Sequence, residues 1–430
     1  MWCKEREHSA ANSVAALHDA PRLHAPVLPG IHVCYFFSCR TASARDPCLA
    51  MPVLCRSVTV QVNPGLNSSL VPPGLVNLVH YQAVGPHDTL HYVWSTIGAP
   101  TVLLVHCTGN QSQLKVDWEQ LLKNGSRSLR IIPEDKVTFS QAVVFSELME
   151  FYDVNDTADM EKSQQLSPAY RLEDFVWEDV NSTFNPTTLG VEFRGRNATG
   201  PKGNFNNGSI SISVMVYKST GREKSLPKLE YSANSTQFQF RVDKVMPRSN
   251  RSRFGLGLLV TQRSNGTTRL ESVHTIDDEH TPSIFEMVQL IVSQQNASKA
   301  EGFVQWKPVA YTSDPPNRGA SSPCHHYPMP PVTHSVPGSS IAFAYYGPDG
   351  FTAALNVSFG IGEDGFYNAT QFFSWTGLVG YGTPAKDSFS VLVIIIMAVG
   401  LGISAVLLLI TAVVACVKWR HKAQGYEPID

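Results

Sequence analysis

Charged side chains are scarce in this sequence of 430 residues. Asp, Glu, Lys and Arg together make up 16% of the chain, less than in an average soluble protein, and the formal net charge is -2. A balance so close to neutral gives no electrostatic footprint for nucleic acid, so no nucleic-acid partner is expected. Something other than charge must keep the surface of the protein hydrated.

The sequence also lacks the motifs of common hydrolases and nucleotide-binding enzymes. It contains no G-x-S-x-G, no H-E-x-x-H and no phosphate-binding glycine loop. His87 and His91 lie in a strand-like segment, which would hold their rings roughly 13 Å apart, too far for one metal ion. Cys324, His325 and His326 form an equally weak metal motif in a Pro-rich stretch. No metal and no cofactor are expected.

One acidic cluster keeps an enzymatic alternative open. Asp277, Asp278 and Glu279 offer the paired carboxylates that a membrane-anchored lumenal hydrolase would use. A solvated turn before Pro282 explains the same residues more simply. The sequence therefore favours a protein that is not an enzyme, with the hydrolase as the alternative.

Cysteine is sparse in the main body of the chain. Of the eight cysteines, five fall within the first 55 residues and Cys416 lies in an apolar run, which leaves Cys107 and Cys324. An oxidising compartment would allow these two to form a disulfide. Two buried free thiols are the alternative that the sequence leaves open.

N-glycosylation sequons, in contrast, are abundant. The pattern Asn-x-Ser/Thr occurs at 13 of the 20 asparagines, where chance would give roughly three or four. All precede the apolar run near the C-terminus, which predicts that this part of the chain is lumenal or extracellular and carries bulky glycans. The sequons lie at Asn67, Asn110, Asn124, Asn155, Asn181, Asn197, Asn207, Asn234, Asn250, Asn265, Asn296, Asn356 and Asn368.

A single membrane span is predicted at residues 389–417. Val391–Val417 carries no charge, and about 20 apolar residues suffice to cross the hydrocarbon core. Lys418, Arg420 and Lys422 follow at once, as expected on the cytosolic side of a span. Sequons before the span and basic residues after it both predict a lumenal N-terminal region and a cytosolic tail at 418–430.

Small residues recur within this span. Ala398, Gly400, Gly402 and Ser404 form two overlapping small-x-x-x-small pairs. Such residues let a second membrane helix approach closely, so they predict a helix-packing face.

The cytosolic tail ends in Gly-Tyr-Glu-Pro-Ile-Asp. Tyr426 and Ile429 have the spacing of a Tyr-x-x-apolar sorting signal, which an extended tail presents to the two pockets of a clathrin adaptor. A short tail directly behind a single span resembles those of lysosomal membrane proteins. The tail therefore predicts delivery to the lysosomal membrane.

The first 55 residues do not read as a signal peptide. Charged residues and His interrupt the start, and Pro21, Pro26 and Pro29 break the stretch that follows. An apolar core of roughly 7–15 residues is needed. We interpret residues 1–55 as an atypical leader, an alternative or wrongly joined first segment, and expect the folded body to begin near Arg56.

From Arg56 onward the chain reads as an all-β lumenal region. Short apolar or alternating runs are separated by Gly, Pro and Asn, which is typical of β-sandwiches. The clearest expected strands are Ser57–Val62, Leu90–Trp94, Thr101–Val105, Ile210–Tyr217, Gln237–Val242, Gly255–Val260, Ile341–Tyr346 and Ala353–Phe359. Leu114–Leu122 and Ser283–Val292 are the best candidates for short helices.

About 330 lumenal residues exceed one small sandwich, so two packed β-sandwich-like units are expected. We place them at residues 56–222 and 223–386, with a seam at Ser219–Pro227. A Pro-, Ser- and His-rich surface loop is predicted at 314–338 within the second unit.

Four stretches carry a resemblance to a known family. "LHYVWSTIG" (Leu90–Gly98), "SVHTIDDEHTPSIFEMVQL" (Ser272–Leu290), "GFVQWKPVAY" (Gly302–Tyr311) and "FFSWTGLVGYGTP" (Phe372–Pro384) resemble the glycosylated lysosomal membrane protein family. The span and the tail lie where that family has them, and the resemblance runs from about Arg56 to the end.

The resemblance implies an accessory subunit. Its partner would be a polytopic lysosomal transporter of the major facilitator superfamily that exports dipeptides, and the glycosylated lumenal part would shield that transporter from proteolysis. A cell-surface adhesion molecule or receptor is a further reading of the same span. The sequence leaves open whether the chain also forms a homodimer.

Replacing Tyr426 with Ala should move the protein from the lysosome to the cell surface, because the adaptor loses the side chain that fills one pocket. Surface biotinylation measures the change, and Glu427→Ala, between the two anchoring positions, is the matched control. An unchanged lysosomal location would contradict the sorting role. A surface location before and after the change would instead favour the adhesion molecule or receptor.

Overall fold

The computed structural model describes residues 55–67, 69–70, 76–163, 165–197, 204–263, 266–275, 285–294, 301–328, 335–385 and 391–423. Of the predicted leader, 1–54 lies outside this range, and the first strand begins at Ser57. The strands are β1 (Ser57–Val62), β2 (Leu78–Val84), β3 (Asp88–Ser95), β4 (Thr101–Thr108), β5 (Gln113–Val116), β6 (Leu129–Ile132), β7 (Val137–Tyr152), β8 (Tyr170–Arg171), β9 (Phe175–Trp177), β10 (Gly190–Asn197), β11 (Ser209–Val216), β12 (Gly221–Arg222), β13 (Glu230–Tyr231), β14 (Ser235–Asp243), β15 (Ser252–Gln262), β16 (Thr267–His274), β17 (Glu286–Ser293), β18 (Glu301–Tyr311), β19 (Ser321–Pro328), β20 (Phe351–Phe359) and β21 (Phe372–Tyr381). The α-helices are α1 (Trp118–Leu121), α2 (Ile341–Tyr346) and α3 (Val391–Ala423).

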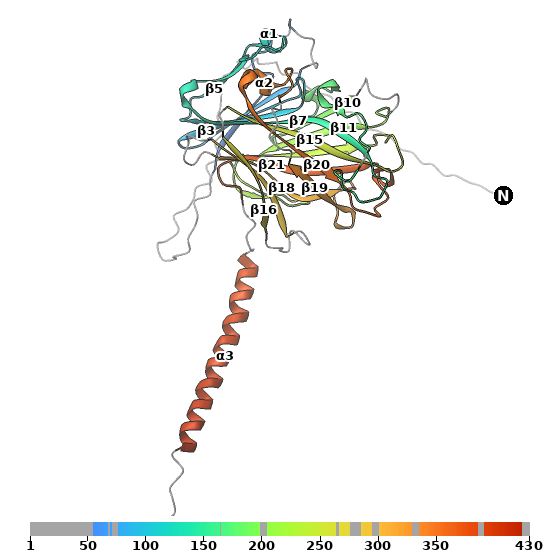
Figure 1. Ribbon diagram of the computed structural model, residues 1–430. Coiled ribbons are helices and arrows are strands. Elements are labelled where there is room, and N and C mark those ends of the chain that lie inside the picture. Colours follow the sequence, from blue (N-terminus) through green and yellow to red (C-terminus); the bar gives the residue numbers. More distant parts are fainter. Residues whose placement is uncertain are drawn as a thin grey trace, which may run out of the picture. The chain divides into compact units, whose positions relative to one another are not determined.

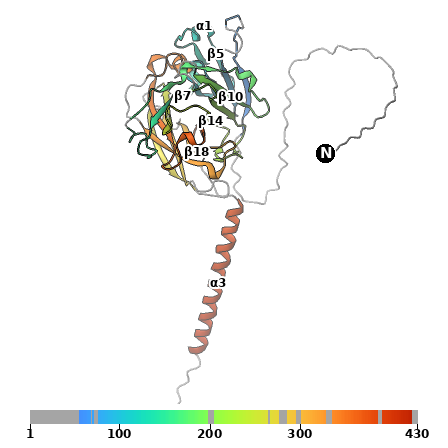
Figure 2. The same cartoon turned by 90° about the vertical axis from the view of Figure 1, so that its right-hand side faces the viewer.

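The predicted all-β class with one C-terminal apolar helix is confirmed. Antiparallel pairing gives one layer in the order β1-β2-β3-β4-β7-β15-β20-β19 and a second in the order β9-β10-β11-β14-β21-β18-β17-β16. β19 pairs with both β18 and β20 and so joins the layers into one continuous sheet. Figure 1 shows β7 beside β15 and β21 beside β18, and Figure 2 gives the view at 90°.

The main core fills the space between the two layers. Phe145 of β7 packs edge-on against Phe238 of β14, with ring centroids 5.3 Å apart, and the Trp94 indole donates across the layers to Thr236. Trp306 and Trp375 are also fully buried here. Burial of such large aromatic side chains supplies much of the hydrophobic stabilisation of a β-sandwich.

A second core lies on the outer face of the first layer. In β4, Val102 and Leu104 join the main core, whereas Leu103 and Val105 join the second core beside α2. Because successive side chains of a strand point to opposite faces, a strand covered on both sides is apolar throughout. This explains the unbroken apolar run that begins β4.

The structure corrects the proposed division at residue 222. β7 pairs with β15 over Gln141–Tyr152, and β11 pairs with β14, so both layers take strands from both sides of the seam. Residues 56–222 and 223–386 therefore do not fold as two separate sandwiches. Within the predicted loop at 314–338, Ser321–Pro328 forms strand β19.

The structure also changes the secondary structure predicted for three short segments. Ile341–Tyr346 is helix α2 and not a strand, because the Ser340 side chain accepts the N–H of Phe343 at its start and Gly347 ends it at a positive φ. Ser283–Val292 contains strand β17, whose side chains are buried on both faces. Leu114–Leu122 divides between β5 and the four-residue α1.

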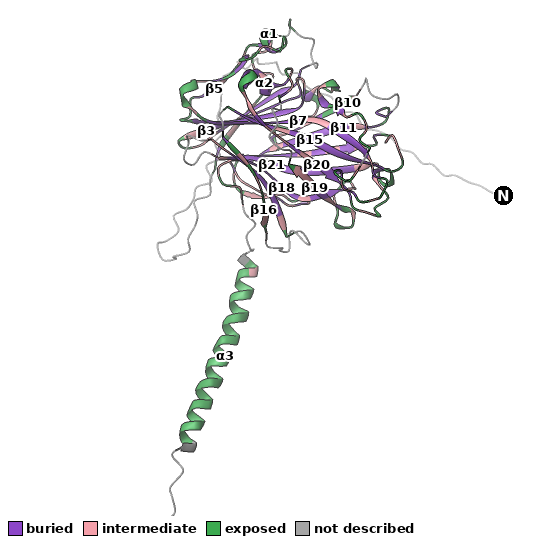
Figure 3. Ribbon diagram, in the orientation of Figure 1, coloured by how far each residue is buried: buried purple, intermediate pink, exposed green. Residues whose placement is uncertain are grey.

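Helix α3 begins at Val391, covers the rest of the span predicted at 389–417 and continues through Lys418–Ala423; residues 389 and 390 lie outside the described part of the chain. Leu392–His421 is long and apolar enough to cross a membrane. Almost all its described side chains are exposed, whereas the strands of the β body are largely buried (Figure 3). An apolar helical surface of this length is stable in a lipid bilayer and not in water.

Candidate functional site

The sequon asparagines that the structure describes are all accessible. Asn265 and Asn296 lie outside the described residues, and none of the other eleven is buried. Asn197, Asn234 and Asn356 are half-buried. The exposed ones are Asn67, Asn110, Asn124, Asn155, Asn181, Asn207, Asn250 and Asn368. The eight exposed asparagines thus lie where a glycan has room to project.

Four of the exposed sequons gather where strands of both layers end. Tyr152 at the end of β7 pairs with Ser252 at the start of β15, and Asp243 at the end of β14 pairs with Phe372 at the start of β21. The loops at this end contain residues 153–158, 244–251 and 360–371, together with 204–208 before β11, whose first residue Ser209 pairs with Asp243. We call these loops the sequon-bearing end. They carry Asn155, Asn207, Asn250 and Asn368.

Backbone hydrogen bonds tie these loops to one another. The Asp153 N–H donates to the Arg251 carbonyl at 3.1 Å, the Met246 N–H to the Asn204 carbonyl at 2.8 Å, and the Lys244 N–H to the Gln371 carbonyl at 2.8 Å. Each bond joins two different loops of the sequon-bearing end. The four sequons are therefore held in one connected surface.

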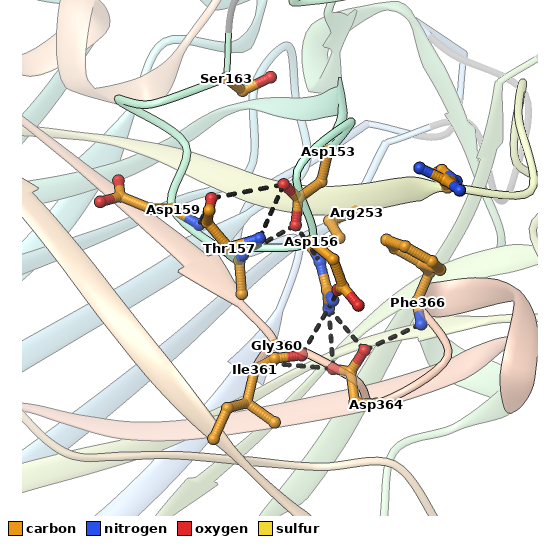
Figure 4. Close-up of polar contacts among 12 residues, drawn as sticks. Asp153, Asp156, Thr157, Asp159, Ser163, Arg253, Gly360, Ile361, Asp364 and Phe366 are labelled. Carbon is orange, nitrogen blue, oxygen red and sulfur yellow. Dashed lines mark hydrogen bonds and ion pairs between the residues drawn. The ribbon is translucent and has the colours of Figure 1, made fainter.

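A buried arginine lies beneath this end (Figure 4). Arg253, near the start of β15, is 1% exposed, and its guanidinium reaches carboxylates from two loops. Its Nε lies 2.8 Å from Asp153, one terminal nitrogen 2.6 Å from Asp156 and the other 2.8 Å from Asp364. We call these four residues the Arg253 clamp, because they fasten the loop after β7 to the loop after β20.

Backbone donors complete the clamp. Asp153 accepts the N–H groups of Thr157 and Ala158, at 3.0 and 2.8 Å. Asp364 accepts those of Ile361 and Phe366, at 3.0 and 2.8 Å. A buried ion pair is stable when further hydrogen bonds satisfy its remaining atoms, and these bonds do so.

Two carboxylates of the clamp, Asp153 and Asp364, have lowered pKa values. Burial raises the pKa of Asp153, but the N–H groups of Thr157 and Ala158 and the Arg253 guanidinium outweigh burial and leave the pKa below its usual 3.8. Burial also raises the pKa of Asp364, but hydrogen bonds outweigh burial and leave this pKa below 3.8. The Arg253 guanidinium is the main cause that lowers it. A lowered carboxyl pKa contributes stability that is lost only as pH falls through the folded pKa. Asp153 and Asp364 therefore keep their ionic contacts with Arg253 in the mildly acidic range.

A pair of buried histidines, in contrast, makes the protein less stable in mild acid. His80 Nε2 lies 2.9 Å from His91 Nδ1, and His91 Nε2 lies 2.8 Å from the Ser112 hydroxyl. Burial, with His91 nearby, lowers the pKa of His80 to about 3, and burial lowers the pKa of His91 to about 4. Both rings are neutral when folded but bind protons once unfolded below about pH 6.5, so acid costs stability.

The predicted disulfide does not form. Cys107 and Cys324 are free thiols, Cys107 in the second core and Cys324 in the main core. Burial raises the pKa of Cys107 to about 11, which keeps that thiol protonated and unreactive. The free-thiol alternative is the one that the structure contains.

No metal-ligand cluster occurs among the described residues. His87 is exposed and His91 fully buried, on or beside β3, so they share no site. The hydrolase residues Asp277, Asp278 and Glu279 and the sorting residues Tyr426 and Ile429 lie outside the described part of the chain.

The predicted helix-packing face divides into two. At about 100° per residue, Ala398 and Gly402 lie on one side of α3, and Gly400 and Ser404 lie about 160° away. A Cβ added at Gly400 or Gly402 would meet nothing within 4 Å among the described residues. The Ser404 hydroxyl donates to the Gly400 carbonyl at 2.9 Å, so it is satisfied within the helix. Two separate small-residue pairs remain, one on each side.

Sequence patterns did not identify the Arg253 clamp. Arg253 precedes the expected strand at Gly255–Val260, and Asp153 and Asp156 follow a long apolar run. A charged residue directly before a buried strand was the available signal. It predicts that Arg253 needs a partner but cannot identify residues about 100 positions away.

Comparisons with known proteins point to one family. The family model described as "Glycosylated lysosomal membrane protein" matches residues 77–422. "Glycosylated lysosomal membrane protein A" of Xenopus laevis is 45% identical over 87% of this chain and 93% of its own. The Danio rerio relative is 41% identical over 87% and 92%, and the Homo sapiens relative 36% over 78% and 82%. These descriptions name a membrane glycoprotein and give no support to a hydrolase.

Replacing Arg253 with Gln should lower the free energy of unfolding by about 3–5 kcal/mol, because three carboxylates lose their buried cation. Urea unfolding of the purified full-length protein, followed by tryptophan fluorescence, measures this loss. Arg251→Gln is the matched control, since Arg251 is exposed and its guanidinium donates to the Val154 carbonyl. The control should stay within about 0.5 kcal/mol of the wild type. Equal losses in the two variants would contradict the clamp.

Stability should fall between neutral pH and about pH 5, by about 1.4 kcal/mol per pH unit below pH 6.5 for each buried imidazole. His80→Leu removes one titrating ring and should therefore reduce the slope of unfolding free energy against pH. His87→Gln, at an exposed position beside β3, is the control and should keep the full slope. A wild-type protein equally stable at both pH values would refute this account of the histidine pair.

Proposed function

The chain belongs to the glycosylated lysosomal membrane protein family, and we propose that it acts as the accessory subunit of a polytopic lysosomal transporter. The partner is a dipeptide exporter of the major facilitator superfamily, as the resemblance implies. In this role the chain performs no catalysis. It binds the transporter, stabilises it and shields it from lysosomal proteases.

The proposed topology is that of a single-pass type I membrane protein. Every sequon precedes α3, and the basic residues Lys418, Arg420 and Lys422 follow the uncharged run. Both features support a lumenal β body and a cytosolic tail, in which Tyr426 and Ile429 bind a clathrin adaptor.

Shielding would arise from the accessible glycans. A protease must bind an extended segment of backbone, and bulky glycans on several neighbouring loops exclude it from their surroundings. The sequon-bearing end offers four such positions on loops that are bonded together, and the Arg253 clamp keeps two of these loops in place. That connected and clamped surface is the observation that carries the proposal.

Helix α3 would supply the contact within the membrane. Ala398 with Gly402, or Gly400 with Ser404, leaves room for a transporter helix to approach closely. Because each partner binds only the folded form of the other, complex formation stabilises both partners by mass action.

Depleting this protein should shorten the half-life of the transporter in lysosomes, because the transporter loses its shield. Cycloheximide chase with quantitative immunoblotting measures the half-life. Re-expression of the wild type should restore it. The variant with Gln at Asn155, Asn207, Asn250 and Asn368 should restore it only in part.

The control for that experiment carries Gln at three other exposed sequons, Asn67, Asn110 and Asn124, and should restore the half-life. Both variants must first reach lysosomes with unchanged melting temperatures, so that folding defects are separated from shielding. An unaltered transporter half-life after depletion would disprove the accessory role. Equal rescue by both variants would disprove the part assigned to the sequon-bearing end.

A further inference from the structure

An arginine-lined hollow of about 450 Å³ lies outside the sequon-bearing end. Its walls come from the segment around β6, from α2 and the turn that follows it, and from the end of β15. Arg127 and Arg130 contribute from the first of these and Arg263 from the last, and the acidic residues Glu134 and Asp349 also line it. The hollow has the volume of a small-molecule site.

The three arginines have free donors. Elsewhere in the described β body most arginines are paired, as Arg56 is with Asp88 and Arg222 is with Glu230. Among the described residues, Arg127, Arg130 and Arg263 form no side-chain hydrogen bond or ion pair, although two carboxylates line the same hollow. Arg263 lies over the ring of Tyr345, 5.1 Å from its centroid, which orients the guanidinium.

The ring of Tyr346 forms another part of the wall. Tyr346 is 7% exposed and lines the hollow, while its hydroxyl is closed to solvent and faces the Ser140 side chain of β7 in the interior. A ligand in the hollow would therefore contact the aromatic ring of Tyr346 and not its hydroxyl.

We propose that this hollow is a binding site for a small organic anion whose carboxylate or phosphate ester lies between Arg127, Arg130 and Arg263. Guanidinium groups present paired donors that match both oxyanions and remain charged at every lysosomal pH. Three arginines and the two carboxylates Glu134 and Asp349 give the hollow a formal net charge of one positive unit. This balance favours a ligand that carries a low negative charge. The site is independent of the transporter role.

Isothermal titration of the full-length protein in detergent, at about pH 5 and fixed ionic strength, tests the proposal. The probes are glycerol phosphate and glycerate, which are similar in size and differ in the oxyanion. At least one should bind, and the one that binds more tightly identifies the ligand as a phosphate ester or a carboxylate. The double variant Arg130→Gln with Arg263→Gln should weaken binding by about tenfold or more.

Two further variants make the result specific. Tyr346→Phe removes only a hydroxyl that faces away from the hollow, and it should leave binding unchanged with the fold intact. Arg196→Gln with Arg318→Gln removes two exposed arginines that are equally unpaired but lie outside the hollow, and should leave binding unchanged. Absence of binding by both probes at millimolar concentration, or equal weakening in this control, would overturn the proposal.

Discussion

The organisation of the sequon-bearing end depends on one buried guanidinium. Arg253 neutralises carboxylates from two loops that are about 200 residues apart in the chain, and it lies at the start of the strand between them. An isolated buried charge would be strongly destabilising, so the loops must keep their carboxylates in place for the body to fold. The same contacts fix the chain around Asn155 and close to Asn368. A core requirement thereby determines where these two sequons lie on the surface.

Mild acid leaves the carboxylates of Asp153 and Asp364 ionised but makes the buried pair of histidines destabilising. Asp153 and Asp364 have lowered pKa values because backbone and guanidinium donors favour their ionised forms. His80 and His91 have lowered pKa values because burial disfavours their charged forms. Below about pH 6.5, the carboxylates retain their contribution while the imidazoles lose theirs. Under the proposed function the body would work below the pH of its greatest stability, and binding to a partner would offset part of that loss.

Much of the fold followed from local sequence patterns. Alternation in Ser57–Val62 and Gln237–Val242 predicted β1 and most of β14, and the uncharged run predicted α3. Ile341–Tyr346 failed because a six-residue apolar run fits a buried strand and a buried helix equally well, and the Ser340 cap and Gly347 were the deciding signals. The division at residue 222 failed because strand pairing over long sequence separations leaves no local trace.

The candidate site was predictable only in its surface features. Sequons can be identified from the sequence because a short motif defines them. In the structure, none of the described sequon asparagines is buried. The Arg253 clamp and the arginine-lined hollow arise from residues far apart in the chain, so only the folded arrangement brings them together. The predicted pairing of Cys107 and Cys324 failed for the same reason, since residue type alone does not give proximity.

Hydrogen exchange in the clamped loops tests the central claim most directly. The amides of Thr157, Ala158, Ile361 and Phe366 donate to the clamp carboxylates, and the full-length glycoprotein can be measured near pH 5 and near pH 7. After correction for intrinsic exchange rates, strong and equal protection at both pH values is expected, because these carboxylates stay ionised. Loops that lose protection near pH 5 would contradict the account.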